Sequence, residues 1–84
     1  MRSIYPVLGR TIRELRKKRG LSQDVLSGLA GIARTHLTMI ENGKIHANIE
    51  TIWKLAIALD LRPSELFAYV ERALEQDGRK NADM

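Results

Sequence analysis

The polar side chains best placed for chemistry lie in one segment, and their types suit recognition of a nucleic acid. On a helix over about residues 33–42, one outer face would carry Arg34, Thr35, Thr38, Met39 and Asn42. A planar guanidinium can donate two hydrogen bonds to O6 and N7 of guanine, and a threonine can bond a base edge or touch a thymine methyl group. We therefore expect base contacts from Arg34, Thr35 and Thr38. The alternatives are a phosphate contact or a solvated side chain for Arg34, and hydrogen bonds to their own helix for the threonines.

Two short helices joined by a tight turn must hold that face. Ser22 is a favoured N-cap for a first helix over about residues 22–30, and Gly31 supplies a turn conformation that other residues resist. The inner side of this first helix is expected to hold Val25, Leu26, Leu29 and Ala30. The second helix, over residues 33–42, ends at Gly43, a natural C-terminal cap. This is the pattern of a helix-turn-helix, whose second helix enters the DNA major groove.

The rest of the chain also predicts helices, and no segment alternates long enough for a strand. Further helices are expected over about residues 6–19, 48–60 and 63–77. Pro63 suits the first turn of the last helix, and Gly78 is expected to end it. The sequence thus predicts an all-α, compact five-helix domain over residues 1–78, followed by a flexible tail over residues 79–84.

Composition limits the chain to one small domain. The 84 residues leave room for a single core, and without cysteine neither a disulfide nor a thiolate zinc site can hold the fold. The longest apolar run, over residues 55–59, is far shorter than the ~20 residues of a membrane helix, and no signal-peptide core is present. We therefore expect a soluble, unsecreted, cytoplasmic protein that does not meet a membrane.

Positive charge is concentrated in the first part of the chain. Residues 1–48 hold nine lysines and arginines against three acidic residues, a formal charge of +6, whereas residues 49–84 carry −2. The basic part coincides with the predicted helix-turn-helix, as expected for a surface that meets a polyanion. A solvated basic face without a ligand is the alternative.

No set of residues points to catalysis. The sequence contains no nucleophile–base pair and no phosphate-binding loop. His36 and His46 are the only histidines, they lie ten positions apart, and they do not make a metal site. His36 flanks the outer face of its helix and could meet a phosphate, with a solvated histidine as the alternative. We therefore expect no enzyme, no metal and no cofactor.

Four motifs in sequence order give the chain a family resemblance. They are Gly20-Leu21-Ser22-Gln23, Ala30-Gly31-Ile32, Ile40-Glu41-Asn42-Gly43-Lys44 and Leu61-Arg62-Pro63-Ser64-Glu65-Leu66-Phe67. With these motifs the chain resembles the lambda-repressor-like helix-turn-helix proteins of the XRE and Cro type, over residues 12–67. The resemblance implies a transcription regulator of bacterial or phage origin that binds a near-palindromic DNA operator as a homodimer and regulates its own gene. Such a protein would associate with the nucleoid when bound to DNA.

The resemblance also assigns roles to particular residues. The positions that face the bases match Arg34, Thr35, Thr38 and Met39. The positions that contact phosphates match Gln23 and Asn42, and Lys44 and His36 are further candidates for phosphate contacts. In relatives with the same helix ending, the glutamate that matches Glu41 is buried and pairs with an arginine that matches Arg16.

Two details bear on the kind of regulator. Arg34-Thr35 fits the controller proteins of restriction–modification systems, whereas Ile45 departs from their pattern because a basic residue is common there. Ala33 stands where a serine or threonine often caps the recognition helix, which is the second helix of the motif, over residues 33–42. The first turn of that helix is therefore expected to lack a side-chain cap.

Apolar residues beyond the needs of one core predict a partner surface. The last helix continues past Phe67, where a minimal domain could stop, and its extra stripe holds Val70, Ala73 and Leu74. We expect these residues, with Ile57, to form a two-fold dimer interface, and the alternative is that the core uses them. A competing function is that of an antitoxin, which would bind a toxin protein through this surface and repress their shared promoter.

Overall fold

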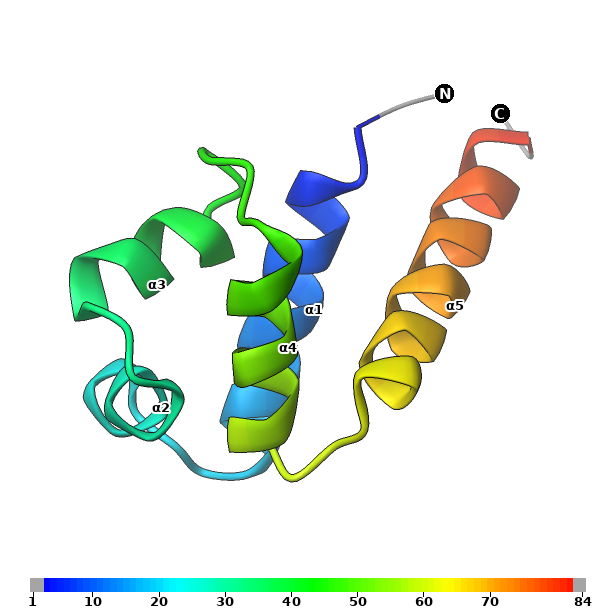
Figure 1. Cartoon of the computed structure of the whole chain (residues 1–84). Coiled ribbons are helices and arrows are strands. Elements are labelled where there is room, and N and C mark those ends of the chain that lie inside the picture. The colour runs from blue at the N-terminus through cyan, green and yellow to red at the C-terminus, as the bar shows by residue number, and fades with distance from the viewer. Residues whose placement is uncertain (1–2, 83–84) are drawn as a thin grey trace.

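A computed structural model describes residues 3–82 and contains five α-helices. They are α1 (Tyr5–Lys18), α2 (Gln23–Ala30), α3 (Arg34–Glu41), α4 (Ile49–Ala58) and α5 (Pro63–Ala82) (Figure 1). No strand occurs within the described residues. The predicted all-α five-helix fold is confirmed, and every helix end except the last lies within two residues of its predicted position.

Local capping defines α2 and the neighbouring helix α4. The Ser22 hydroxyl accepts a hydrogen bond from the amide of Val25 at 3.1 Å, and the Asn48 side chain accepts one from the amide of Thr51 at 2.8 Å. Gly31 has a φ of 70°, a conformation in which a side chain would be strained. The turn between α2 and α3 is therefore set by residues that can be recognised in the sequence.

The core lies where the inner faces of all five helices meet. Helix α3 packs on α1 and α2, α2 packs also on α4, and α5 packs on α1 and α4 (Figure 1). The largest fully buried side chains are Leu8, Ile12, Leu26, Leu37, Leu55, Leu59 and Leu66. Figure 1 shows α2 and α3 together on one side of the molecule and α5 on the other, so the motif keeps an open outer face.

The last helix is longer than predicted. Helix α5 runs through Gly78 to Ala82, so the prediction that Gly78 ends the helix is wrong, and residues 79–82 of the predicted tail continue the helix. Gly78 is not among the residues with a positive φ, and glycine inside a helix costs only about 1 kcal/mol relative to alanine. No proline follows to stop the helix. Residues 83–84 of the predicted tail lie outside the described residues.

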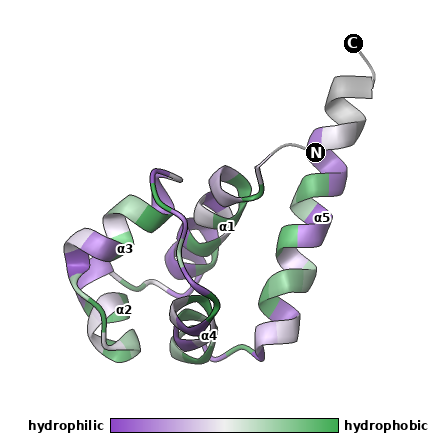
Figure 2. Ribbon diagram, turned by 45° about the horizontal axis from the view of Figure 1, so that its top comes forward, coloured by the Kyte–Doolittle hydropathy of each residue, from purple (hydrophilic) through white to green (hydrophobic). Residues whose placement is uncertain are grey.

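Three apolar residues lie elsewhere than predicted. Val25 and Leu29 were expected to face inward from α2, but both are exposed, Leu29 by 62%. Only the side of α2 that carries Leu26 and Ala30 reaches the core. Val70 is only 3% exposed because it belongs to the core of its own chain, so the expectation that it needs a partner to cover it is wrong. Figure 2 shows alternating hydrophobic and hydrophilic bands along α5, as expected of a helix with one covered side.

At Gly9, α1 lies so close to the backbone at the end of α3 that no side chain fits between them. A Cβ at this position would overlap the carbonyl oxygen of Ile40 and would lie 2.8 Å from that of Glu41. Because both neighbours are backbone atoms, neither can move without shifting the end of α3.

We expect Gly9→Ala to lower the free energy of unfolding by about 1–3 kcal/mol, because an added methyl group in a filled space forces a backbone shift. Thermal unfolding followed by circular dichroism would measure the change. Gly28→Ala is the matched control: nothing lies within 4 Å of a Cβ at Gly28. It should raise stability by about 0.5–1 kcal/mol through helix propensity. Equal stability of the Gly9→Ala variant and the wild type would contradict the contact.

Candidate nucleic-acid interface

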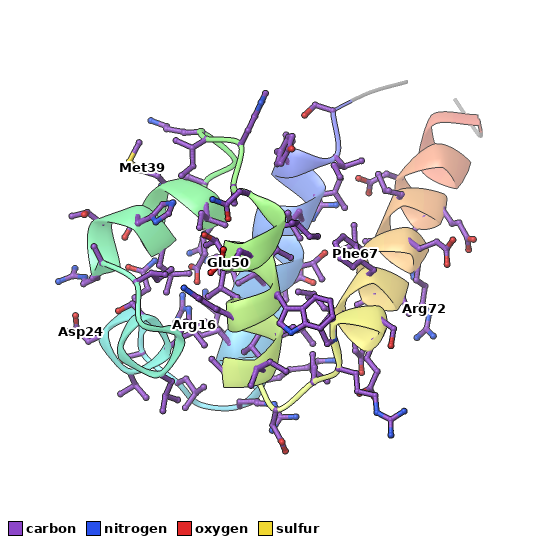
Figure 3. The ribbon with its side chains drawn as sticks, in the orientation of Figure 1. Arg16, Asp24, Met39, Glu50, Phe67 and Arg72 are labelled. Atoms are coloured by element: carbon purple, nitrogen blue, oxygen red, sulfur yellow. The ribbon has the colours of Figure 1, made fainter. Side chains whose placement is uncertain are left out.

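The outer face of α3 carries the residues expected to meet bases. Arg34, Thr35 and Met39 are exposed, and Thr38 is half-buried at the edge of α2. Figure 3 shows Met39 pointing away from the body of the protein. On the opposite side of α3, Leu37, Ile40 and Glu41 are buried and fix the helix on α1 and α2. The recognition helix therefore presents one polar face to solvent and anchors the other in the core.

A buried ion pair lies beneath the motif. Arg16 Nε donates to Glu41 Oε2 at 2.7 Å and Arg16 Nη2 donates to Glu41 Oε1 at 3.0 Å, while Arg16 Nη1 donates to the carbonyl of Leu21 at 2.9 Å. The side chains of Arg16 and Glu41 are only 10% and 1% exposed. The structure thus brings together the pair that the family resemblance implies, and Figure 3 shows Arg16 in the interior of the fold. The hydrogen bonds to Glu41 raise the pKa of Arg16 above its usual range, against the opposing effect of burial.

Gln23 connects this pair to the recognition helix. Its Nε2 donates to Glu41 Oε1 at 3.1 Å, and its Oε1 accepts a hydrogen bond from the Thr38 hydroxyl at 3.0 Å. Sequence reasoning assigned Gln23 to a phosphate and did not find these contacts. A side-chain amide has two N–H donors, so one donor remains for a phosphate. No local pattern could have found the link, because it depends on how α2 and α3 cross.

Arg34 has an acidic neighbour that was also missed. Its Nε lies 3.7 Å from the carboxylate of Asp24, the acidic residue in the first turn of α2 (Figure 3). Both side chains are mostly exposed, and such pairs contribute only about 0–1 kcal/mol. Asp24 can therefore orient the guanidinium in the free protein without preventing it from reaching a base.

The remaining candidates surround the recognition helix. Asn42 and Lys44 are exposed at its C-terminal end, and His36 is half-buried on its flank. Ala33 provides no side-chain cap for α3, as expected. The loop that follows is held by His46, whose ring stacks on Tyr5 of α1 with centroids 4.2 Å apart.

Neither a metal-binding cluster nor a membrane-spanning helix is found in residues 3–82. No group of three or more histidine, cysteine, aspartate or glutamate residues there is arranged to hold a metal ion. Over the same range, no helix has the length and apolar character needed to cross a lipid bilayer.

The order of the helices and the geometry of the motif agree with a known family. A helix-turn-helix family model matches residues 12–66 of this chain. This chain belongs to the helix-turn-helix family. Members place the second helix of the motif in the DNA major groove, so the protein is a DNA-binding regulator of transcription. The predicted resemblance is confirmed, and it covers the ion pair, the turn and the recognition helix.

Within the helix-turn-helix family, the chain is similar to controller proteins. It is 33% identical over 73 residues to the control protein C.MunI of a Mycoplasma species, covering 86% of this chain and 99% of that one. It is 40% identical to the restriction–modification controller protein C.AhdI of Aeromonas hydrophila. The two structures superpose with a TM-score of 0.72 over 74% of this chain and 94% of the C.AhdI chain. The controller C.Esp1396I, solved as a tetramer with its natural 35-base-pair operator, matches with a TM-score of 0.81 over 87% of this chain and 96% of its own. At 16% identity the C.Esp1396I match shows a shared fold alone.

Proposed function

We propose that this protein binds a near-palindromic operator upstream of its own gene as a homodimer and reads the bases with α3. The observation that carries the proposal is the polar outer face of α3, which is exposed while its inner face is fixed by the Arg16–Glu41 pair. Two copies related by a two-fold axis would place their α3 helices in successive major grooves, about 34 Å apart. Gln23, Asn42, Lys44 and His36 lie around that face, in places that suit phosphate contacts.

The similarity to C.MunI and C.AhdI supports a controller role for a restriction–modification system. A restriction or methylation gene beside the gene of this protein would agree with that role. The relatives named above are controllers, which favours the regulator over the antitoxin as the function of this chain.

The test is binding to the duplex upstream of its own gene, compared with a scrambled duplex, by fluorescence anisotropy at about 150 mM salt. We expect tight binding to the first duplex, weak binding to the second, and a steep loss of affinity as salt rises. Equal and weak binding to both duplexes would contradict the proposal.

Arg34→Ala should lower affinity for the operator by about 5- to 150-fold for each half-site, the effect of losing one bidentate contact to guanine from each copy in the dimer, and should change affinity for the scrambled duplex much less. Anisotropy titrations against both duplexes measure the two effects. Arg72→Ala is the control, because it also removes one exposed arginine but lies on α5, away from α3 and from Ile57 (Figure 3). An equal loss on both duplexes would show that Arg34 contacts a phosphate and does not read a base.

For the dimer, we propose a surface centred on Ile57 of α4. Ile57 is 58% exposed, and with Leu29 and Trp53 it lines a shallow pocket between the end of α2 and α4. Of the other residues assigned to the interface, Ala73 and Leu74 are half-buried against the core, so they can add contacts only at its edge. Exposed aliphatic and aromatic residues gathered in this way favour a second copy as the cover.

A further inference from the structure

A chain of hydrogen bonds leads from the buried ion pair to the outer face of α3. Glu41 accepts two hydrogen bonds from Arg16 and a third from the Gln23 amide, through its Oε1, at 3.1 Å. The oxygen of that amide accepts from the Thr38 hydroxyl at 3.0 Å. The chain therefore joins α1, α2 and α3, and it ends at a residue of the recognition helix.

The carboxylate of Glu41 fixes which way the Gln23 amide points. A carboxylate paired with a guanidinium is ionised and can only accept hydrogen bonds. A flipped amide would turn its oxygen toward the Glu41 oxygen, which would place two partial negative charges 3.1 Å apart. The NH₂ group of Gln23 must therefore face Glu41, and its oxygen must face Thr38.

Thr38 has one hydroxyl proton, and both of its partners within the protein can only accept it. These partners are the Gln23 side-chain oxygen at 3.0 Å and the backbone carbonyl of Arg34 at 3.1 Å. Whichever of the two receives the proton, the hydroxyl presents only lone pairs to a molecule on the outer side of α3.

We propose that Thr38 reads its base as a hydrogen-bond acceptor only, and that Gln23 is the positioning residue that sets this polarity. In the major groove, adenine and cytosine offer amino groups at N6 and N4, whereas guanine and thymine offer the oxygens O6 and O4. The base that faces Thr38 is therefore adenine or cytosine. This inference rests on the proposed function, because it requires α3 to lie in the major groove.

The test is selection of bound duplexes from a pool randomised across one half-site, using the full chain. At one position, the wild type should prefer adenine or cytosine over guanine or thymine by about 2- to 12-fold, the effect of one neutral hydrogen bond. Thr38→Ser keeps the hydroxyl and should keep the preference. Thr38→Val keeps the methyl group and the shape, and it should lose the preference at that position alone.

Gln23→Met tests the positioning role. The preference should weaken at the same position, because the hydroxyl keeps the Arg34 carbonyl as its one acceptor and becomes free to turn toward the DNA. A Gln23 that served stability alone, or that bound only phosphate, would lower affinity for all sequences equally and leave the preference intact, which would overturn its positioning role.

Three other outcomes would overturn the proposal that Thr38 reads its base as an acceptor. The first is that Thr38→Val removes a preference for guanine or thymine. The second is that the preference survives in Thr38→Val but is lost in Thr38→Ser, and the third is that no position responds to Thr38→Val. A wild-type protein that enriches no sequence at all would overturn the proposed function itself, and with it this inference.

Discussion

Arg16→Met should lower the free energy of unfolding by about 3–5 kcal/mol, because it leaves the carboxylate of Glu41 buried without its cation. Methionine fills much of the space of the arginine stem, so the loss reports the charge and its hydrogen bonds more than a cavity. For a domain of this size, each kcal/mol corresponds to about 4–8 °C in the midpoint of thermal unfolding. Circular dichroism against temperature would measure the shift, and chemical denaturation would give the free energy itself.

Arg10→Met is the matched control. Arg10 lies on the same helix and also pairs with a carboxylate, that of Asp77 at 2.9 Å, but both side chains are partly exposed. An exposed pair contributes about 0–1 kcal/mol, so this variant should unfold almost like the wild type. A double variant, Arg16→Met with Glu41→Met, should be less destabilised than the sum of the two single variants, because no charge is left buried. Similar small losses for Arg16→Met and Arg10→Met would contradict the structural role of the buried pair.

The stability that Arg16 contributes should not depend on pH near neutrality. Its pKa is raised in the folded protein, because its hydrogen bonds to Glu41 favour the charged form. A raised pKa gives stability that is fully present below the pKa of the unfolded chain and is lost only as pH rises through the higher folded value. Both values lie in strongly alkaline solution. Titration of Arg16 therefore cannot account for any change in stability near neutral pH.

Local signals in the sequence predicted the helices and the motif well. Ser22, Gly31 and Asn48 act within a few residues of their own positions, so the residue type alone indicates the cap or the turn. Gly78 was misread because a glycine can end a helix or continue it, and its neighbours in sequence do not decide which.

The parts that could not be predicted depend on how helices cross. The sequence predicted too many buried residues on α2, because all four of its apolar side chains were expected to face inward: Val25, Leu26, Leu29 and Ala30. Only packing against α3 and α4 decides which of them are covered. The link from Gln23 to Thr38 joins residues 15 positions apart on two helices. The buried pair was expected only through the family resemblance, since nothing local to Arg16 distinguishes it from the other cations of α1.

Ile57→Glu should convert the proposed dimer to a monomer and lower affinity for the full operator by about 100- to 10,000-fold, because the second half-site is then no longer bound within one complex. A two-fold axis near Ile57 would bring two carboxylates together on an apolar surface, which costs both desolvation and repulsion. Sedimentation equilibrium over a range of concentrations measures the dimer, and anisotropy on full and half operators measures the consequence for DNA binding.

The effect of Ile57→Glu on dimerisation can be separated from misfolding, because the side chain of Ile57 is exposed. Because Ile57 is 58% exposed, the variant should still unfold cooperatively, and its unfolding temperature should fall below that of the wild type only by the loss of dimer stabilisation, which shrinks as protein concentration is lowered. Ile49→Glu is the control, since it makes the same change on the same helix at a residue that is 62% exposed and two turns away. The Ile57→Glu protein should also bind a half operator as tightly as a wild-type monomer does, because α3 and the Arg16–Glu41 pair are untouched. If Ile57→Glu still forms a dimer at the concentrations at which the wild type does, the two-fold contact lies elsewhere. The next candidate for that contact is Tyr69, the remaining exposed aromatic residue, on α5 at the far side of the domain from α3.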